Sequence, residues 1–122
     1  MAKGDELQER LIQFAARIIK VSNALPKTAA GRHVANQILR SGTAPAAHHG
    51  EARSAESTPD FIHKLKIGVK ELNETEVWLR IIVASEMLSE VQLSGLVDEC
   101  SQLQRIFNAS IATARKSNAL KE

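Results

Sequence analysis

The chain lacks several features that large functional classes require. Its 122 residues include one cysteine, one tryptophan, three phenylalanines and no tyrosine. A lone cysteine excludes an internal disulfide and fits a reducing compartment. Scarce aromatic residues disfavour binding of single-stranded nucleic acid by base stacking. Because no run approaches about 18 apolar residues and no secretory signal opens the chain, we expect a cytoplasmic protein without a membrane partner.

Motifs for catalysis and metal binding are also missing. The sequence contains no GxxxxGK[ST], no GxSxG and no plausible Ser-His-Asp set. Its four histidines have no HxxxH spacing and no second cysteine accompanies them, so we expect neither a metal nor another cofactor. Glu71, Glu74 and Glu76 lie close together in the sequence, but no nucleophile accompanies them, so a solvated or salt-bridged helix face explains them better. The sequence therefore predicts no catalytic residue and no enzyme.

Charge is distributed unevenly along the chain. Residues 10–50 contain six basic side chains and no acidic one, whereas residues 71–99 contain seven acids and one base. This polarity has two interpretations: a positive face that attracts a polyanion, or complementary packing between helices or protomers of opposite charge, which we favour slightly. Under the first interpretation, the candidate nucleic-acid-binding residues are Arg10, Arg17, Lys20, Arg32 and Arg40.

The spacing of apolar residues predicts four helices. The first begins near Asp5 and ends near Asn23, because Pro26 disfavours helical geometry at the preceding residue. The second begins after Thr28, its expected cap, and runs to about Glu56. Helix breakers at Gly42 and Pro45 leave two interpretations, a kinked helix or two helices separated by a turn; the good helix formers that follow favour the kinked helix. The apolar seam of the first helix is Leu7, Leu11, Phe14, Ile18, Val21 and Leu25.

The third helix has the clearest start, because Ser57-Thr58-Pro59-Asp60 combines a capping hydroxyl with proline and an acid in the first turn. It should extend to Met87. A capping-box pattern at Ser89-Glu90-Val91-Gln92 opens the fourth helix. The predicted third seam is Ile62, Leu65, Val69, Leu72, Glu76, Leu79 and Val83, with Trp78, Ile67, Ile81 and Ile82 on a second buried face. The predicted fourth seam is Leu93, Leu96, Cys100, Leu103, Phe107, Ser110 and Ala114.

These elements predict an all-α protein, an antiparallel up-down-up-down four-helix bundle formed by residues 1–122 as one domain. Residues 1–4 and 117–122 are expected to be frayed. Cys100 is expected to be a small core residue and not a nucleophile.

Polar residues gather in the small-residue segment of the second helix. Two interpretations compete: a cluster that contacts a partner or RNA, and a structural network or oligomer interface, which we favour because buried polar groups need partners. The residues concerned are Arg40, Ser41, Thr43, His48 and Glu51, and Trp78 of the third helix is grouped with them.

Three segments carry a family resemblance: LPK at 25–27, QILRSGT with the small residues and EA that follow it at 37–52, and DFIHKLKIGVKELNETEVWL at 60–79. In these segments the chain resembles the four-helix-bundle family of 23S ribosomal RNA intervening-sequence proteins. The resemblance implies an antiparallel bundle and a homo-oligomer, typically a five-fold ring. It also suggests kinship with the pentameric accessory protein of diversity-generating retroelements, which binds nucleic acid and a reverse transcriptase. We therefore expect a pentameric protein that binds RNA or DNA; a protein-interaction scaffold without nucleic-acid binding is the alternative.

Overall fold

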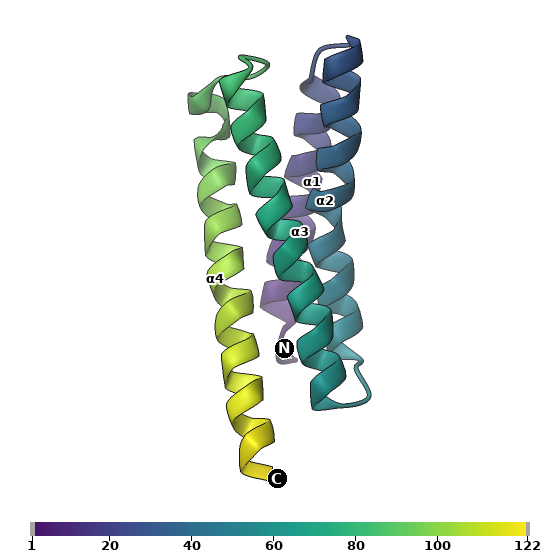
Figure 1. Ribbon diagram of the computed structural model, residues 1–122, viewed down its shortest axis with the longest axis vertical. Helices are drawn as coiled ribbons and strands as arrows, with labels where there is room; N and C mark the ends of the chain where they lie inside the picture. Colours follow the sequence, from purple (N-terminus) through teal and green to yellow (C-terminus); the bar gives the residue numbers. More distant parts are fainter. Residues whose placement is uncertain (1, 122) are drawn as a thin grey trace.

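The computed structural model describes residues 2–121 and forms a bundle of four long α-helices (Figure 1). They are α1 (Asp5–Ala24), α2 (Ala29–Arg53), α3 (Thr58–Ala84) and α4 (Glu90–Lys121). Each helix packs along the one before it, and α4 closes the bundle against α1 through a thinner contact. The helices alternate in direction, so the predicted up-down-up-down topology is confirmed.

Local capping explains where three of the helices begin. Thr28 and Ser57 each accept, through the side-chain oxygen, a hydrogen bond from the backbone N–H three residues later. Ser89 and Gln92 form the predicted capping box, because each backbone N–H donates to the side-chain oxygen of the other residue, at 2.9 and 3.1 Å. The sequence therefore places these three starts correctly.

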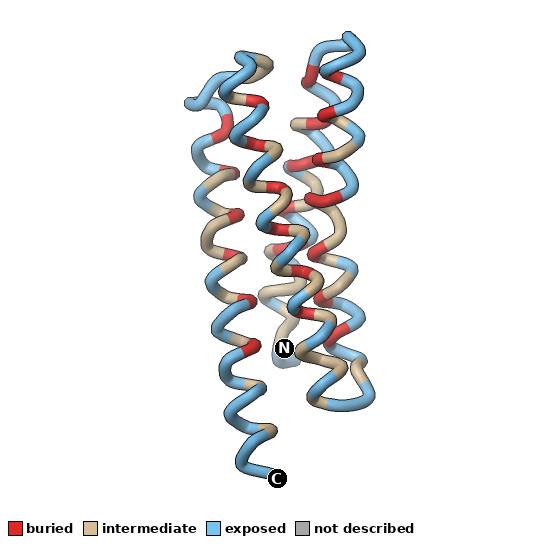
Figure 2. The backbone as a smooth tube through the Cα atoms, viewed as in Figure 1, coloured by how far each residue is buried: buried red, intermediate tan, exposed pale blue. Residues whose placement is uncertain are grey.

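The core is aliphatic with two phenylalanines, and it follows the inner side of every helix (Figure 2). On α1, Leu11, Phe14 and Ile18 are buried, as the predicted seam requires. On α4 the buried line agrees with the predicted seam as far as Phe107 and then continues through Ile111 in place of Ser110. Burial of large apolar side chains is the main stabilising contribution in a bundle of this kind.

The predicted register of α3 is partly wrong. The buried residues of α3 are Leu65, Gly68, Leu72, Thr75, Leu79 and Ile82. Ile82, which the sequence pattern places on a second face with Trp78, is fully buried in the core, while Trp78 is only partly buried. The error arises because two core positions, Gly68 and Thr75, are not large apolar residues and so were not recognised. The stripe of Ile62, Val69, Glu76 and Val83 instead lies beside the core and is partly buried.

The second helix passes through Pro45 without interruption, so the interpretation of one helix in this segment is confirmed. Pro45 is itself buried in the core. Close packing accompanies it: a Cβ on Gly42 would lie 2.6 Å from Cγ2 of Ile18, so only glycine fits between α1 and α2 here. The helix ends at Arg53, slightly before the predicted end near Glu56.

The two chain ends lie at the same end of the bundle as the α2–α3 loop (Figure 1). Helix α4 continues to Lys121, through residues that the sequence predicts to be frayed, and its last turns extend beyond the other helices. These turns are mostly exposed (Figure 2). Of the predicted frayed residues, 1 and 122 lie outside the described part of the chain.

Candidate nucleic-acid interface

The predicted polar cluster divides into separate groups along the α2–α3 side. Arg40 forms ion pairs with Glu71, through Nη1 at 3.2 Å, and with Glu74. Trp78 donates from Nε1 to the same Glu74 carboxylate at 2.9 Å, and the His33 ring stands edge-on to the indole. Arg40 and Trp78 therefore belong to one network that joins α2 to α3 within a single chain.

The remaining members of the predicted cluster lie apart from this network. Ser41 is fully buried and accepts a hydrogen bond from the Thr75 hydroxyl at 2.9 Å. The Thr43 hydroxyl donates back to the carbonyl of Leu39 on its own helix. These contacts satisfy polar groups locally and fix how α2 packs on α3.

His48 and Glu51 form a third group, nearer the α2–α3 loop. Oε2 of Glu51 lies 3.8 Å from Nδ1 of His48 and 3.3 Å from Nζ of Lys64. Nδ1 of His48 is buried and has no hydrogen-bond partner. The Arg40-to-Glu51 segment therefore provides three separate sets of contacts along one side of the bundle.

Two of the five candidate nucleic-acid-binding residues are neutralised inside the chain. Arg10 binds the Glu99 carboxylate of α4 through two nitrogens, at 2.7 and 3.2 Å, and also donates to Gln102. The hydrogen bond with Glu99 raises the pKa of Arg10 further above its ordinary value. Arg40 is held by Glu71 and Glu74 on the α2–α3 side, which is opposite the α1–α4 side in this bundle.

The other three candidates are exposed. Arg17 lies over Gly95 of α4, because a Cβ built on Gly95 would lie 3.3 Å from Nη2 of Arg17. Arg32 donates to the backbone carbonyl of Lys27 at 2.6 Å. Arg17, Lys20 and Arg32 have no acidic partner within residues 2–121. Arg10 and Arg17 lie on the α1–α4 side and Arg40 lies on the opposite, α2–α3 side, so the structure does not bring all five candidates together as one surface.

The structure instead brings together a basic set that the sequence analysis missed. Lys66 and Lys70 of α3 and Arg115 of α4 line one surface hollow of about 490 Å³, with His63 and Asn108 beside them. The apolar residues that line the hollow are Ile67, Val69 and Ile111. Among the described residues, no acid lines this hollow, and its three cations take part in no ion pair. We call Lys66, Lys70 and Arg115 the α3–α4 basic surface.

A sequence signal for this surface exists. Residues 100–121 contain four basic side chains and no acid. In an antiparallel hairpin that turns between Ala84 and Glu90, residue 66 lies beside residue 108, and both line the hollow. The acid-free segment of α4 is therefore placed against Lys66 and Lys70 of α3 by topology alone.

Two buried ionisable groups lie elsewhere in the core. Burial raises the pKa of the Cys100 thiol to about 12, and Glu76 and Glu99 add to the effect. The thiol lies 3.4 Å from the carbonyl oxygen of Leu72, and its side chain is fully buried, as expected for a core cysteine. Burial also lowers the pKa of His49, with a further contribution from Arg53.

Neither a metal-ligating cluster nor a membrane span occurs within residues 2–121. No group of three or more histidine, cysteine, aspartate or glutamate side chains converges in a way that could hold a metal ion. None of the four helices combines the length and hydrophobicity needed to cross a bilayer.

Comparison with known proteins agrees with this architecture. The family profile of the 23S rRNA-intervening sequence protein matches residues 6–109. The chain belongs to this family. A crystal structure of a protein of unknown function from the S23 ribosomal protein family of Bacteroides thetaiotaomicron is 33% identical and superimposes with a TM-score of 0.81, over 85% of this chain and 96% of that one. No curated protein matches the chain.

The intervening-sequence family match reaches into α4 but stops before its last turns. Lys66 and Lys70 lie within the matched residues, whereas Arg115 lies beyond them. The α3–α4 basic surface therefore consists of a part of α3 that the family profile covers and a part of α4 that it does not cover.

Proposed function

We propose that this member of the family is a non-catalytic, homo-oligomeric protein that binds RNA or DNA through the α3–α4 basic surface. One observation carries the proposal: Lys66, Lys70 and Arg115 line a single hollow without acids, while Arg10 and Arg40 are occupied by carboxylates of their own chain. Cations that have no internal partner can neutralise phosphates, which is the main source of non-specific nucleic-acid affinity.

The chemistry of this surface favours contact with the backbone over reading of bases. Lysine and arginine bind phosphate oxygens, and Asn108 adds an amide that can donate to a phosphate or a sugar. No tyrosine is present, and the one tryptophan is held by Glu74 on another side of the bundle. We therefore expect binding that depends weakly on sequence and strongly on salt.

Oligomerisation would multiply these weak contacts. Large apolar side chains remain exposed on α1 at Ile12 and Ile19, and on α3 at Val77 and Ile81. Such residues support self-association, and the family resemblance suggests a pentamer. A ring that repeats one basic surface five times would bind a long polyanion with far higher avidity than a single copy. A reverse transcriptase is a further proposed partner, on the strength of the same resemblance.

The test compares two matched triple variants, each of which removes three positive charges. One is Lys66→Gln, Lys70→Gln and Arg115→Gln; the control is Arg17→Gln, Lys20→Gln and Arg32→Gln. Filter binding of a labelled RNA and a DNA duplex, from about 50 to 200 mM salt, gives the slope of log K against log salt. We expect the first variant to reduce that slope by roughly 2 to 3 for duplex DNA and the control to change it little. No retention of either nucleic acid at about 50 mM salt, or equal loss in both variants, would refute the proposal.

The alternative is a scaffold that binds only proteins, and the exposed apolar residues of α1 and α3 favour it. A scaffold would sediment as a salt-sensitive oligomer whose size and stability are indifferent to added RNA. Sedimentation velocity with and without RNA therefore separates the two functions.

A further inference from the structure

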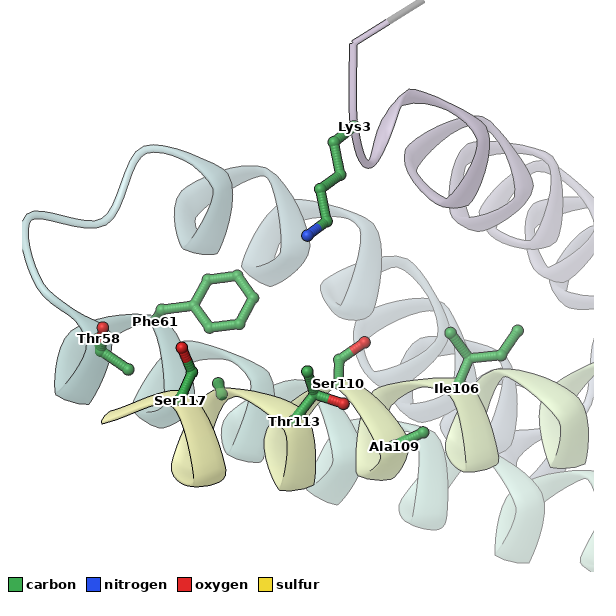
Figure 3. A pocket seen from close by; sticks show the side chains of 9 residues that line it. Lys3, Thr58, Phe61, Ile106, Ala109, Ser110, Thr113 and Ser117 are labelled. Atoms are coloured by element: carbon green, nitrogen blue, oxygen red, sulfur yellow. The ribbon is translucent and has the colours of Figure 1, made fainter. Parts of the chain in front are cut away.

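A groove at the end of the bundle that contains the N-terminus has the form of a small-molecule site. Two hollows of about 720 and 510 Å³ share Lys3, Thr58, Phe61 and Ser110, so they form one continuous depression between the N-terminal segment, the start of α3 and the second half of α4. Figure 3 shows Lys3 reaching from the N-terminal segment toward Phe61 and the hydroxyl-bearing face of α4. We call this depression the terminal groove. Pockets for small ligands typically have volumes of about 300 to 1,000 Å³.

His49 is the buried polar residue of the groove. It is 5% exposed, lines the larger hollow and places Nδ1 2.7 Å from Oε1 of Gln8. The amide nitrogen of Gln8 donates to the carbonyl of Ala46 at 2.9 Å, which fixes the amide so that its oxygen faces the imidazole. An amide oxygen can only accept, so Nδ1 of His49 must carry the proton.

This arrangement leaves a free acceptor. In a neutral imidazole with a proton on Nδ1, Nε2 has a lone pair, and within residues 2–121 it has no hydrogen-bond partner. Nε2 is open to solvent, because the one side-chain nitrogen or oxygen that is both buried and without a partner among the described residues is Nδ1 of His48. A small molecule in the groove can therefore replace water at Nε2. A ligand that donates an N–H or O–H to Nε2 would satisfy it.

The other side chains of the groove define the rest of the ligand. Leu7 and Phe61 provide apolar surface in the larger hollow, and Ile106 and Ala109 do so in the smaller one. Two cations line the groove, and one of them, Lys3, has no carboxylate partner among the described residues. The second cation, Arg53, is paired with Asp5 and donates to the carbonyl of Lys3. One acid, Glu56, also lines the larger hollow.

We propose that the terminal groove binds a small aromatic acid that carries a hydroxyl or ring N–H. Its donor binds Nε2 of His49, its ring lies against Phe61, and its carboxylate binds Lys3. This inference is independent of the nucleic-acid proposal, since the groove shares no residue with the α3–α4 basic surface.

The test uses three related probes and the full chain, followed by ¹H–¹⁵N NMR. They are 4-hydroxyphenylacetate, 4-methoxyphenylacetate, which has no donor, and 2-(4-hydroxyphenyl)ethanol, which has no carboxylate. We expect the first to bind up to roughly tenfold more tightly than the methoxy compound, because the loss of one hydrogen bond between ligand and protein weakens binding by up to about that factor. The shifts should involve the amides of His49, Phe61 and Ser110.

Protein variants complete the test. Lys3→Gln should abolish the preference for the carboxylate over the alcohol while preserving the preference for hydroxyl over methoxy; Lys20→Gln, at an exposed position far along α1, should change neither. His49→Phe should remove the hydroxyl preference, and the ligand comparison in the unaltered chain covers the case in which that variant does not fold. Absence of saturable shifts at millimolar probe, or equal affinity for the hydroxy and methoxy compounds, would overturn the proposal.

Discussion

Replacement of Gly68 by alanine should destabilise the bundle, although alanine is the better helix former. A Cβ at this position would lie 2.4 Å from Cε2 of Phe107, more than 1 Å inside the usual carbon–carbon contact of about 3.5 Å. Both residues are fully buried, and the His49 ring, with its centroid 6.0 Å away, restricts movement of the Phe107 ring. The ring therefore has little room to move.

The expected magnitude is the difference between two opposing effects. Overpacking a well-filled core costs about 1 to 3 kcal/mol, and the overlap here places Gly68→Ala near the upper end. Because alanine is a better helix former than glycine, the same substitution also stabilises the folded chain by about 1 kcal/mol. The net expectation is a loss of about 2 kcal/mol in the free energy of unfolding, or a Tm lower by about 6 to 10 °C for a domain of this size.

Urea unfolding followed by circular dichroism measures this loss, and Gly50→Ala is the matched control. A Cβ on Gly50 would meet only Oε1 of Gln8, at an ordinary 3.6 Å, so this variant should be about 0.5 to 1 kcal/mol more stable than the original chain. Adding Phe107→Leu to Gly68→Ala should cost less than the sum of the two single changes, because the smaller side chain relieves the overlap. A Gly68→Ala variant as stable as the unaltered chain would refute the packing described for α3 and α4.

Two further predictions concern buried ionisable groups. Because burial lowers the pKa of His49, the unfolded chain takes up a proton near pH 6.5 that the folded chain resists, so the free energy of unfolding should fall between about pH 7.5 and 5.5. Urea titrations at both pH values should show a smaller fall in the free energy of unfolding for His49→Gln than for the unaltered chain. The control His63→Gln, which changes an exposed histidine, should leave that fall unchanged. Cys100, with a pKa of about 12, should not react with Ellman's reagent at about pH 8 in the folded chain and should react fully in guanidinium; rapid reaction of the folded chain would contradict its burial.

How much of the fold was predictable depends on whether the determining contacts are local. Helix starts at Thr28, Ser57 and Ser89 depend on hydrogen bonds within a few residues, so the sequence alone located them. The register of α3 depends on Gly68 and Thr75, whose roles come from Phe107 and Ser41 on other helices. A pattern search for large apolar residues cannot recognise a core position whose residue is small or hydroxylated because of its partner.

The candidate site was harder to predict than the fold, because ion pairs with residues far away in the sequence decide which basic side chains remain unpaired at the surface. The acidic stretch of residues 71–99 supplies Glu99 to Arg10 and Glu71 and Glu74 to Arg40, so complementary packing between helices of one chain accounts for those two arginines. His49 was passed over because its significance depends on Gln8, 41 residues earlier in the chain.

Under the proposed function, the same pairing indicates where a polyanion would bind. Carboxylates of the later half of α3 and the first half of α4 lie beside the arginines of α1 and α2, and their fields cancel at short range. The α3–α4 basic surface has no such complement, because residues 100–121 contain no acid and no carboxylate lines the hollow that Lys66, Lys70 and Arg115 share. Three cations without an ion pair therefore remain on the α3–α4 side of the bundle. Residues 10–50, the most basic segment of the sequence, thus lose Arg10 and Arg40 to internal ion pairs, whereas Lys66, Lys70 and Arg115 take part in none.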